Sequence, residues 1–129
     1  MSDCLIEENS FMTGNDILIL HEIRHALKKL LEEDEVTTID LRAIPMSPGE
    51  EAKIEEMLGE GEISINLNAL GPSTLIETAI AGVWLVTHYN VEKEILGKFI
   101  EITRVPSLLA SQTEDIESGL QQLTKRLLD

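Results

Sequence analysis

The pattern of apolar and polar positions predicts three helical segments and four strand segments along the chain. Between residues 15 and 33, apolar residues recur every three or four positions, the spacing at which side chains share one face of an α-helix. This apolar stripe consists of Leu20, Ile23, Leu27, Leu30 and Leu31. Asn15 or Asp16 can cap the helix, because a short polar side chain accepts hydrogen bonds from the free amides of the first turn. We therefore expect a first helix over residues 15–33 that buries the stripe.

A second helix is indicated by the residues at its two ends. Ser47 suits the capping position, and Pro48 suits the first helical position. Glu50, three residues after the cap, completes the spacing of a capping box. Gly59 follows, and glycine commonly ends helices in the left-handed conformation. The segment 48–58 is therefore a predicted helix.

The C-terminal segment carries the same kind of signal. Ser111 and Glu114 repeat the spacing of a capping box. Downstream, one helical face is apolar and consists of Ile116, Leu120, Leu123 and Leu127. The pattern predicts a last helix with one apolar face.

Strand signals occur in four segments. Residues 36–44 and 63–67 place apolar side chains at alternate positions, as a half-buried strand does. Residues 74–88 form a long extended stretch, in which Gly82 marks a β-bulge or a point of close approach. Residues 98–104 give a further strand, which Pro106 ends.

The order of these segments is helix, strand, helix, strand, strand, strand, helix. The first strand–helix–strand unit should cross over with right-handed connectivity, its strands parallel neighbours or separated by one strand. The later strands have short connections and should be antiparallel. The sequence therefore predicts an α+β fold of two layers: a mixed, mostly antiparallel sheet of about four strands with helices mainly on one face. Residues 1–14 are expected to be a tail and residues 15–129 a single domain.

Composition limits the classes of partner. A chain of 129 residues suits one domain, and with only 3% aromatic residues its core must be aliphatic. The formal net charge of −14 argues against binding to nucleic acid or to anionic membrane surfaces, because both require a basic surface. An acidic protein can attract a basic protein partner, although acidity more often only maintains solubility.

The N-terminal sequence and the single cysteine indicate the compartment. The start M-S-D-C-L-I-E-E-N-S lacks the basic region of a signal peptide, and no run of 18 apolar residues occurs. Cys4 is the only cysteine, so an internal disulfide is impossible. We expect a cytoplasmic protein.

One short motif raises the possibility of metal chemistry. His21-Glu22-Ile23-Arg24-His25 has the H-E-x-x-H spacing of zinc-protease helices, in which two histidines bind zinc and the glutamate polarises a water molecule. A small zinc hydrolase using His21, His25 and Glu22 is one alternative, and a protein that delivers nickel through both histidines is another. However, His88 is the only other histidine, and lysines share the histidine face. We expect two solvated histidines, no metal or other cofactor, and no enzymatic activity.

Three other segments point to a known family. The first is Leu58-Gly59-Glu60-Gly61-Glu62-Ile63-Ser64, the second combines Glu77-Thr78 with Gly82-Val83-Trp84, and the third combines Ile100-Glu101-Ile102 with Val105-Pro106. In this order they resemble the HupH/HyaF-type hydrogenase expression/formation proteins, over roughly residues 36–128 and as a single C-terminal-type module. These are cytoplasmic accessory factors for the maturation of uptake nickel–iron hydrogenases.

The resemblance implies a non-catalytic chaperone or scaffold that binds an immature hydrogenase subunit, with the small subunit favoured, or another maturation protein. The expected partner-binding residues lie in two stretches of the chain. They are Gly59, Glu60, Gly61, Glu62, Glu77, Thr78, Gly82 and Trp84. A homodimer is also expected, because a small module with edge strands needs to cover them.

The residues themselves leave the role of each group open. Gly59 and Gly61 either present Glu60 to a partner at a constrained corner or simply make the turn. Trp84 either packs in the core or anchors an interface. Glu77 needs a partner such as Arg42 or Arg104 if it faces inward, and it can meet another protein if it faces outward.

Overall fold

A computed structural model describes residues 13–68 and 71–128 of the chain. Its helices are α2 (Asn15–Glu33), α3 (Pro48–Leu58) and α4 (Thr113–Leu128), with short 3₁₀ turns η1 (Leu41–Ala43) and η2 (Ser107–Leu109). Its strands are β1 (Thr37–Asp40), β2 (Ser64–Leu67), β3 (Ser73–Glu77), β4 (Val83–Tyr89) and β5 (Ile95–Ile102). Most of the expected N-terminal tail, with Cys4, lies outside the described residues.

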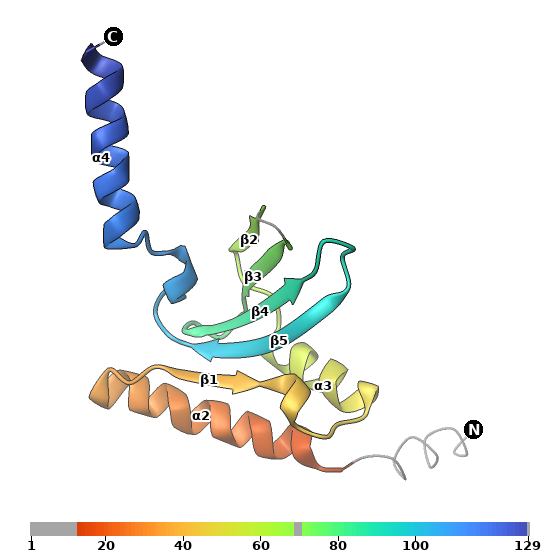
Figure 1. Ribbon diagram of the computed structural model, residues 1–129. Helices are drawn as coiled ribbons and strands as arrows, with labels where there is room; N and C mark the ends of the chain where they lie inside the picture. Colours follow the sequence, from red (N-terminus) through yellow and green to blue (C-terminus); the bar gives the residue numbers. More distant parts are fainter. Residues whose placement is uncertain (1–12, 69–70, 129) are drawn as a thin grey trace.

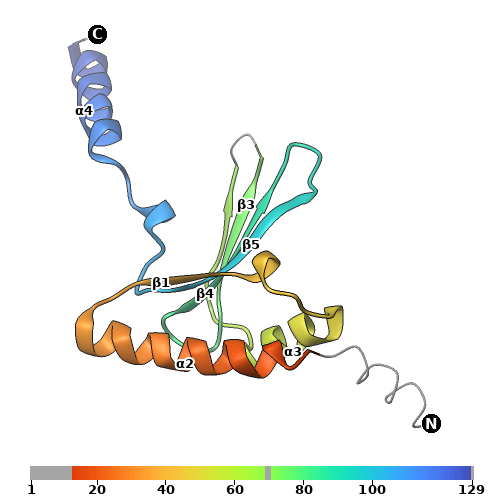
Figure 2. The same cartoon turned by 60° about the horizontal axis from the view of Figure 1, so that its bottom comes forward.

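The strands form one sheet in the order β1-β5-β4-β3-β2, and every neighbouring pair is antiparallel. Helices α2 and α3 pack on one face of this sheet (Figures 1 and 2). The predicted α+β class and the single helical layer are therefore confirmed, with five strands instead of about four.

The expected pairing of the first strand–helix–strand unit is wrong. β1 and β2 lie on opposite edges of the sheet with three strands between them. The reason is that β2, β3, β4 and β5 are joined by short connections and pair as consecutive hairpins. These hairpins leave two free edges, that of β2 and that of β5, and β1 takes the edge of β5, where it pairs from Thr37 opposite Ile102 to Asp40 opposite Phe99.

The expected single strand over residues 74–88 is also wrong, because the chain turns back at residues 78–82 between β3 and β4. The turn was hidden in an apolar run, and only Gly82, which has a φ of 91°, marks it. The first strand is shorter than expected for a different reason. Asp40 accepts a hydrogen bond from the Arg42 amide at 3.0 Å and starts η1, so the strand ends there.

The ends of α2 and α3 are joined by one buried carboxylate. The capping box of Ser47 and Glu50 at the start of α3 is present as predicted. The cap of α2 differs from the prediction, since Gly14 occupies it and no side chain caps it. Instead, Glu50 accepts the Thr13 and Gly14 amides at 3.0 and 2.8 Å, in addition to the Ser47 amide at 3.0 Å. These amide hydrogen bonds, that of Ser47 foremost, outweigh the effect of burial and lower the pKa of Glu50 to about 2.

The main core lies between the helices and the sheet. It consists of Ile19, Ile23, Ala26, Leu30, Ile39, Leu41, Ile54, Leu58, Val83, Ile100 and Ile102. Leu31, which the sequence placed in the buried stripe, is 77% exposed. Leu30 lies within the buried face of α2, and Leu31, about 100° further around the helix, lies at the edge of this face and remains exposed.

A second, smaller group of buried apolar residues lies on the opposite face of the sheet. Leu75 pairs with Val86, and both are fully buried although neither belongs to the main core. Trp84, two residues before Val86, shares this face and is 4% exposed. The sheet is therefore apolar at its centre on both faces.

Helix α4 differs from the other helices in that no residue of it is buried. It projects away from the body, on the side of the sheet opposite to α2 and α3 (Figures 1 and 2). No helix among the described residues is long and apolar enough to cross a membrane.

Candidate partner-binding site

The two stretches predicted from the sequence meet in space. The chain segment that links α3 to β2 runs beside the segment that follows β3. The amide of Gly61 donates to the Glu77 carbonyl at 2.9 Å, and the amide of Ala79 donates to the Leu58 carbonyl at 3.0 Å. We call residues 59–62 and 77–82 together the glycine corner.

Both glycines of residues 59–62 are required by close backbone packing. A Cβ atom on Gly61 would lie 2.5 Å from the Thr78 carbonyl oxygen and 2.8 Å from that of Glu77, which no side chain can tolerate without movement of the backbone. Gly59 has a φ of 70°, and a Cβ there would lie 3.0 Å from the Ala79 Cβ. The corner is therefore held rigidly by main-chain contacts.

Thr78 and Gly82 fix the turn on the other side of the corner. The buried Thr78 hydroxyl lies 2.9 Å from the carbonyl of Val83, to which it can donate, and accepts the Ile80 amide at 3.2 Å. Gly82 accepts the Thr103 amide at 2.9 Å through its carbonyl. A Cβ on Gly82 would lie 3.2 Å from a methyl group of Leu27, so the turn lies close against α2. Both residues therefore position the corner instead of facing outward.

The charged side chains of the corner are those of its three glutamates. Glu60 and Glu62 are exposed, and Glu77 is half-buried. Within residues 13–68 and 71–128, none of the three takes part in an ion pair. The two arginines considered as partners of Glu77 are engaged elsewhere: Arg104 lies 3.4 Å from Asp34, and Arg42 donates to the Ile95 carbonyl at 2.6 Å.

Two hollows border the corner. The larger, which we call the α2 hollow, has a volume of about 480 Å³ and is lined by Leu27, Leu30, Leu31, Glu77, Ala81, Gly82 and Arg104. The smaller, the α3 hollow, has a volume of about 140 Å³ and is lined by Leu41, Ile54, Glu55, Leu58, Gly59, Glu60, Ile76, Thr78, Leu85 and Ile100. The half-buried Glu77 thus lines the α2 hollow and the exposed Glu60 lines the α3 hollow, and most other residues that line the two hollows are apolar.

Leu31 and Arg104 are site residues that the sequence reasoning missed. Both line the α2 hollow, and both are exposed. The sequence contains a partial signal for Leu31, because this residue lies at the edge of the apolar stripe, about 100° around the helix from Leu30. The position of Arg104 could not be read from the sequence, since it depends on how the end of β5 lies beside the turn at Gly82.

Trp84 lies on the face of the sheet away from the helices. Its cross-strand neighbours are Glu77 on β3 and Glu101 on β5, so the indole is flanked by two carboxylates. The indole nitrogen is buried without a hydrogen-bond partner among the described residues. Burial raises the pKa of Glu101, against the opposing charge of His88. Trp84 is therefore a packed residue of the sheet, with a carboxylate residue as cross-strand neighbour on each side.

The two histidines of the H-E-x-x-H motif lie on the exposed side of α2. His25 shares a surface hollow with Arg24 and Lys28, whose charges oppose a divalent cation. His88 belongs to another region, where its Nδ1 lies 2.7 Å from the Ser73 hydroxyl. Within the described part of the chain, no group of three or more histidine, cysteine, aspartate or glutamate side chains is placed to hold a metal ion.

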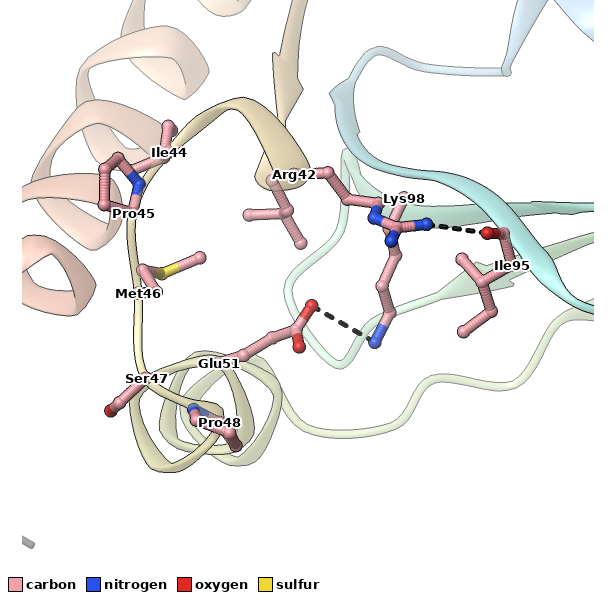
Figure 3. A pocket seen from close by; sticks show the side chains of 10 residues that line it. Arg42, Ile44, Pro45, Met46, Ser47, Pro48, Glu51, Ile95 and Lys98 are labelled. Carbon is pink, nitrogen blue, oxygen red and sulfur yellow. Dashed lines mark hydrogen bonds and ion pairs between the residues drawn. The ribbon is translucent and has the colours of Figure 1, made fainter.

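A third hollow, of about 420 Å³, lies at the start of α3, away from the predicted site residues. Figure 3 shows Arg42 and Lys98 on one side of it and the segment from Ile44 to Pro48 on the other. Lys98 lies 2.9 Å from Glu55 and 3.4 Å from Glu51. Burial acts to lower the pKa of Lys98, but the two carboxylates outweigh burial and raise it. Lys98 is thus held in ion pairs with both carboxylates, which offset its charge.

The fold and the corner together define a class of protein: a small, acidic α+β module whose distinctive feature is a rigid surface corner. Comparison with known proteins specifies the family. A model of the HupH hydrogenase expression protein, C-terminal conserved region, matches residues 13–128. The chain therefore belongs to the HupH hydrogenase expression protein family, and the resemblance seen in the three sequence segments is confirmed.

Individual relatives agree with this assignment. The hydrogenase expression/formation protein HoxQ of Azotobacter vinelandii is 27% identical over 107 residues, which are 81% of this chain and 38% of that protein. The HoxQ protein of Cupriavidus necator is 28% identical over 109 residues, 84% of this chain and 39% of that protein. This chain thus spans about two fifths of the length of these curated relatives.

The fold itself has a solved counterpart. The hydrogenase expression protein HupH from Thiobacillus denitrificans matches with a TM-score of 0.86 and 41% sequence identity. The match covers 91% of this chain and 98% of that one. The arrangement of sheet and helices described above is therefore shared with a solved member of the family.

Proposed function

We propose that this protein is a non-catalytic accessory factor in the maturation of an uptake nickel–iron hydrogenase. It acts in the cytoplasm by binding an immature hydrogenase subunit, with the small subunit favoured. Support comes from membership of the family, whose curated relatives are named hydrogenase expression/formation proteins. The proposal assigns no bond-making step and no cofactor to the side chains of this chain.

The observation that carries the binding role is the glycine corner. Glu60 and Glu62 are exposed on backbone that the contacts of Gly61 hold in place, so little conformational entropy is lost when a partner binds. The neighbouring α2 and α3 hollows offer apolar depressions. A surface of this kind suits a client segment that carries basic residues beside apolar ones.

Catalysis by the histidine motif has less support. A zinc hydrolase needs a third ligand and an open coordination position in a cleft. His21 and His25 instead lie on the exposed side of α2, and His25 lies beside Arg24 and Lys28, whose positive charges oppose a metal cation. We therefore keep the hydrolase and the nickel carrier as alternatives that a metal analysis of untagged protein would detect.

The test is co-purification of the full chain from cells that express the hydrogenase operon. We expect the wild-type protein and Glu92→Lys to enrich an immature hydrogenase subunit, and Glu60→Lys to enrich at least fivefold less. Both residues are exposed glutamates outside the ion pairs of the described residues, and both substitutions change the charge equally. Absence of both hydrogenase subunits from the wild-type eluate would refute the proposed function. If Glu60→Lys enriched a subunit as well as the wild type does, the glycine corner would not be the binding site.

A further inference from the structure

Helix α4 exposes a complete apolar face. Ile116, Leu120, Leu123 and Leu127 are 60%, 68%, 58% and 78% exposed, and no residue of the helix is buried. The helix has 16 residues, and an isolated helix of this length is only marginally stable in water. An exposed, regular helix of this kind requires a partner that covers its apolar face.

The spacing of the four residues indicates the geometry of that partner. They follow one another at intervals of four, three and four residues, which are the core positions of two successive heptads. The positions between them are polar or charged, except for Gly119. A narrow seam of this type packs against one other helix of similar pattern, whereas a helix that lies on a sheet usually needs a broader apolar face.

The charges at the two ends of α4 indicate which helix is its partner. The first turn is acidic, with Glu114 and Asp115, and the last turn is basic, with Lys125 and Arg126. A second copy of α4 in antiparallel orientation places each acidic turn beside a basic turn, and it also aligns the helix dipoles favourably. A parallel copy would place like charges together.

We propose that α4 is the dimerisation element of this protein and pairs antiparallel with α4 of a second copy. Leu120 of one copy then packs against Leu123 of the other, and Ile116 packs against Leu127, about a two-fold axis near the middle of the helix. None of these residues belongs to the glycine corner, so the inference is independent of the proposed function. Each dimer carries two corners.

The first experiment is sedimentation velocity of the full chain over a wide range of concentrations. Two short helices bury an area at the low end of specific interfaces, below about 1,200 Å², so we expect a dissociation constant in roughly the micromolar range. Leu120→Lys/Leu123→Lys should weaken the dimer at least 100-fold. The control Gln121→Lys/Gln122→Lys adds the same charge beside the seam and should change the constant less than threefold. Near-ultraviolet signals of Trp84, which lies in the sheet, verify that the domain remains folded in each variant.

The second experiment tests the orientation at low salt. In an antiparallel pair, Glu114→Lys/Asp115→Lys places basic turns together, and Lys125→Glu/Arg126→Glu places acidic turns together. Each variant alone should dimerise about tenfold more weakly than the wild type, and a mixture of the two should recover wild-type affinity. In a parallel pair the wild type already joins like charges, so Glu114→Lys/Asp115→Lys, which also makes the chain less negative, would not be weaker than the wild type.

Four results would overturn the proposal. They are a monomer at every concentration, a dimer that Leu120→Lys/Leu123→Lys leaves intact, equal weakening by the control, and charge variants that dimerise as well as the wild type. If α4 were protected from hydrogen exchange only after a hydrogenase subunit is added, its apolar face would bind the client. This result would also contradict pairing with α4 of a second copy.

Discussion

Close packing of the backbone determines which residue can occupy several positions of the glycine corner. Gly61 shows this most directly, because the space its side chain would occupy is filled by the carbonyl groups of Glu77 and Thr78. Glycine is required at this position because the segment between α3 and β2 closely approaches the end of β3. The exposed Glu60 beside it is the group that remains free for a partner.

Gly61→Ala should destabilise the protein and impair the corner. Because the new Cβ would lie 2.5 Å from a backbone oxygen, the two segments must separate, at a cost of roughly 2–3 kcal/mol in the free energy of unfolding. Urea denaturation measures this. Gly119→Ala is the matched control: Gly119 lies in α4 with open space around it, so alanine should be neutral or stabilising there by up to ~1 kcal/mol. Equal stability of Gly61→Ala and the wild type would contradict the packing described here.

Glu50 makes stability depend on pH in a defined window. Its pKa falls from 4.5 to about 2 because the Ser47, Thr13 and Gly14 amides bind the ionised carboxylate. A carboxylate with a lowered folded-state pKa stabilises the protein fully above the unfolded value, and this contribution is lost as the pH falls from about 4.5 toward 2. Glu50→Gln should therefore lower Tm by several degrees at pH 7 and much less near pH 2. A difference in Tm that stays constant over this range would show that the charge is unimportant.

At the scale of the elements, the sequence predicted those whose signals are local. The bounds of α3 followed from the capping box and Gly59. Those of α2, a helix of 19 residues, followed from the helical spacing of its apolar residues. Pairing depends on contacts distant in sequence, and there the prediction was wrong: β1 joins β5 instead of a neighbour in the chain. The turn between β3 and β4 was missed because apolar residues surround it and a buried hydroxyl, that of Thr78, closes it.

The candidate site shows the same division between local and distant information. The glycines and glutamates were visible in the sequence, and the structure brings residues 59–62 and 77–82 together. The outward or inward direction of each side chain was not visible. It follows from the alternation along β4, which places Val83 in the main core and Trp84 on the opposite face, with Glu77 and Glu101 as its cross-strand neighbours.

At the scale of the whole molecule, net charge should affect the two proposed interactions in opposite directions. Each chain carries a formal net charge of −14, so two copies repel one another, while a basic client segment is attracted. Salt screens both effects over a distance of about 10 Å at 0.1 M ionic strength. The α4 pair is held mainly by apolar residues, so screening chiefly removes the repulsion between the two bodies, and this should outweigh the weakened attraction between the ends of the helices.

Raising the salt concentration from about 50 to 500 mM should therefore strengthen the dimer and weaken client binding. Sedimentation gives the first constant, and titration of the isolated client subunit gives the second. Glu60→Lys should reduce the salt dependence of client binding strongly and that of the dimer only slightly, because Glu60 lies outside α4 and the substitution changes a small part of the net charge of −14. If client binding instead became stronger with salt, as the dimer should, attraction between the acidic corner and a basic client segment would not drive client binding, and the proposed role of Glu60 would be wrong.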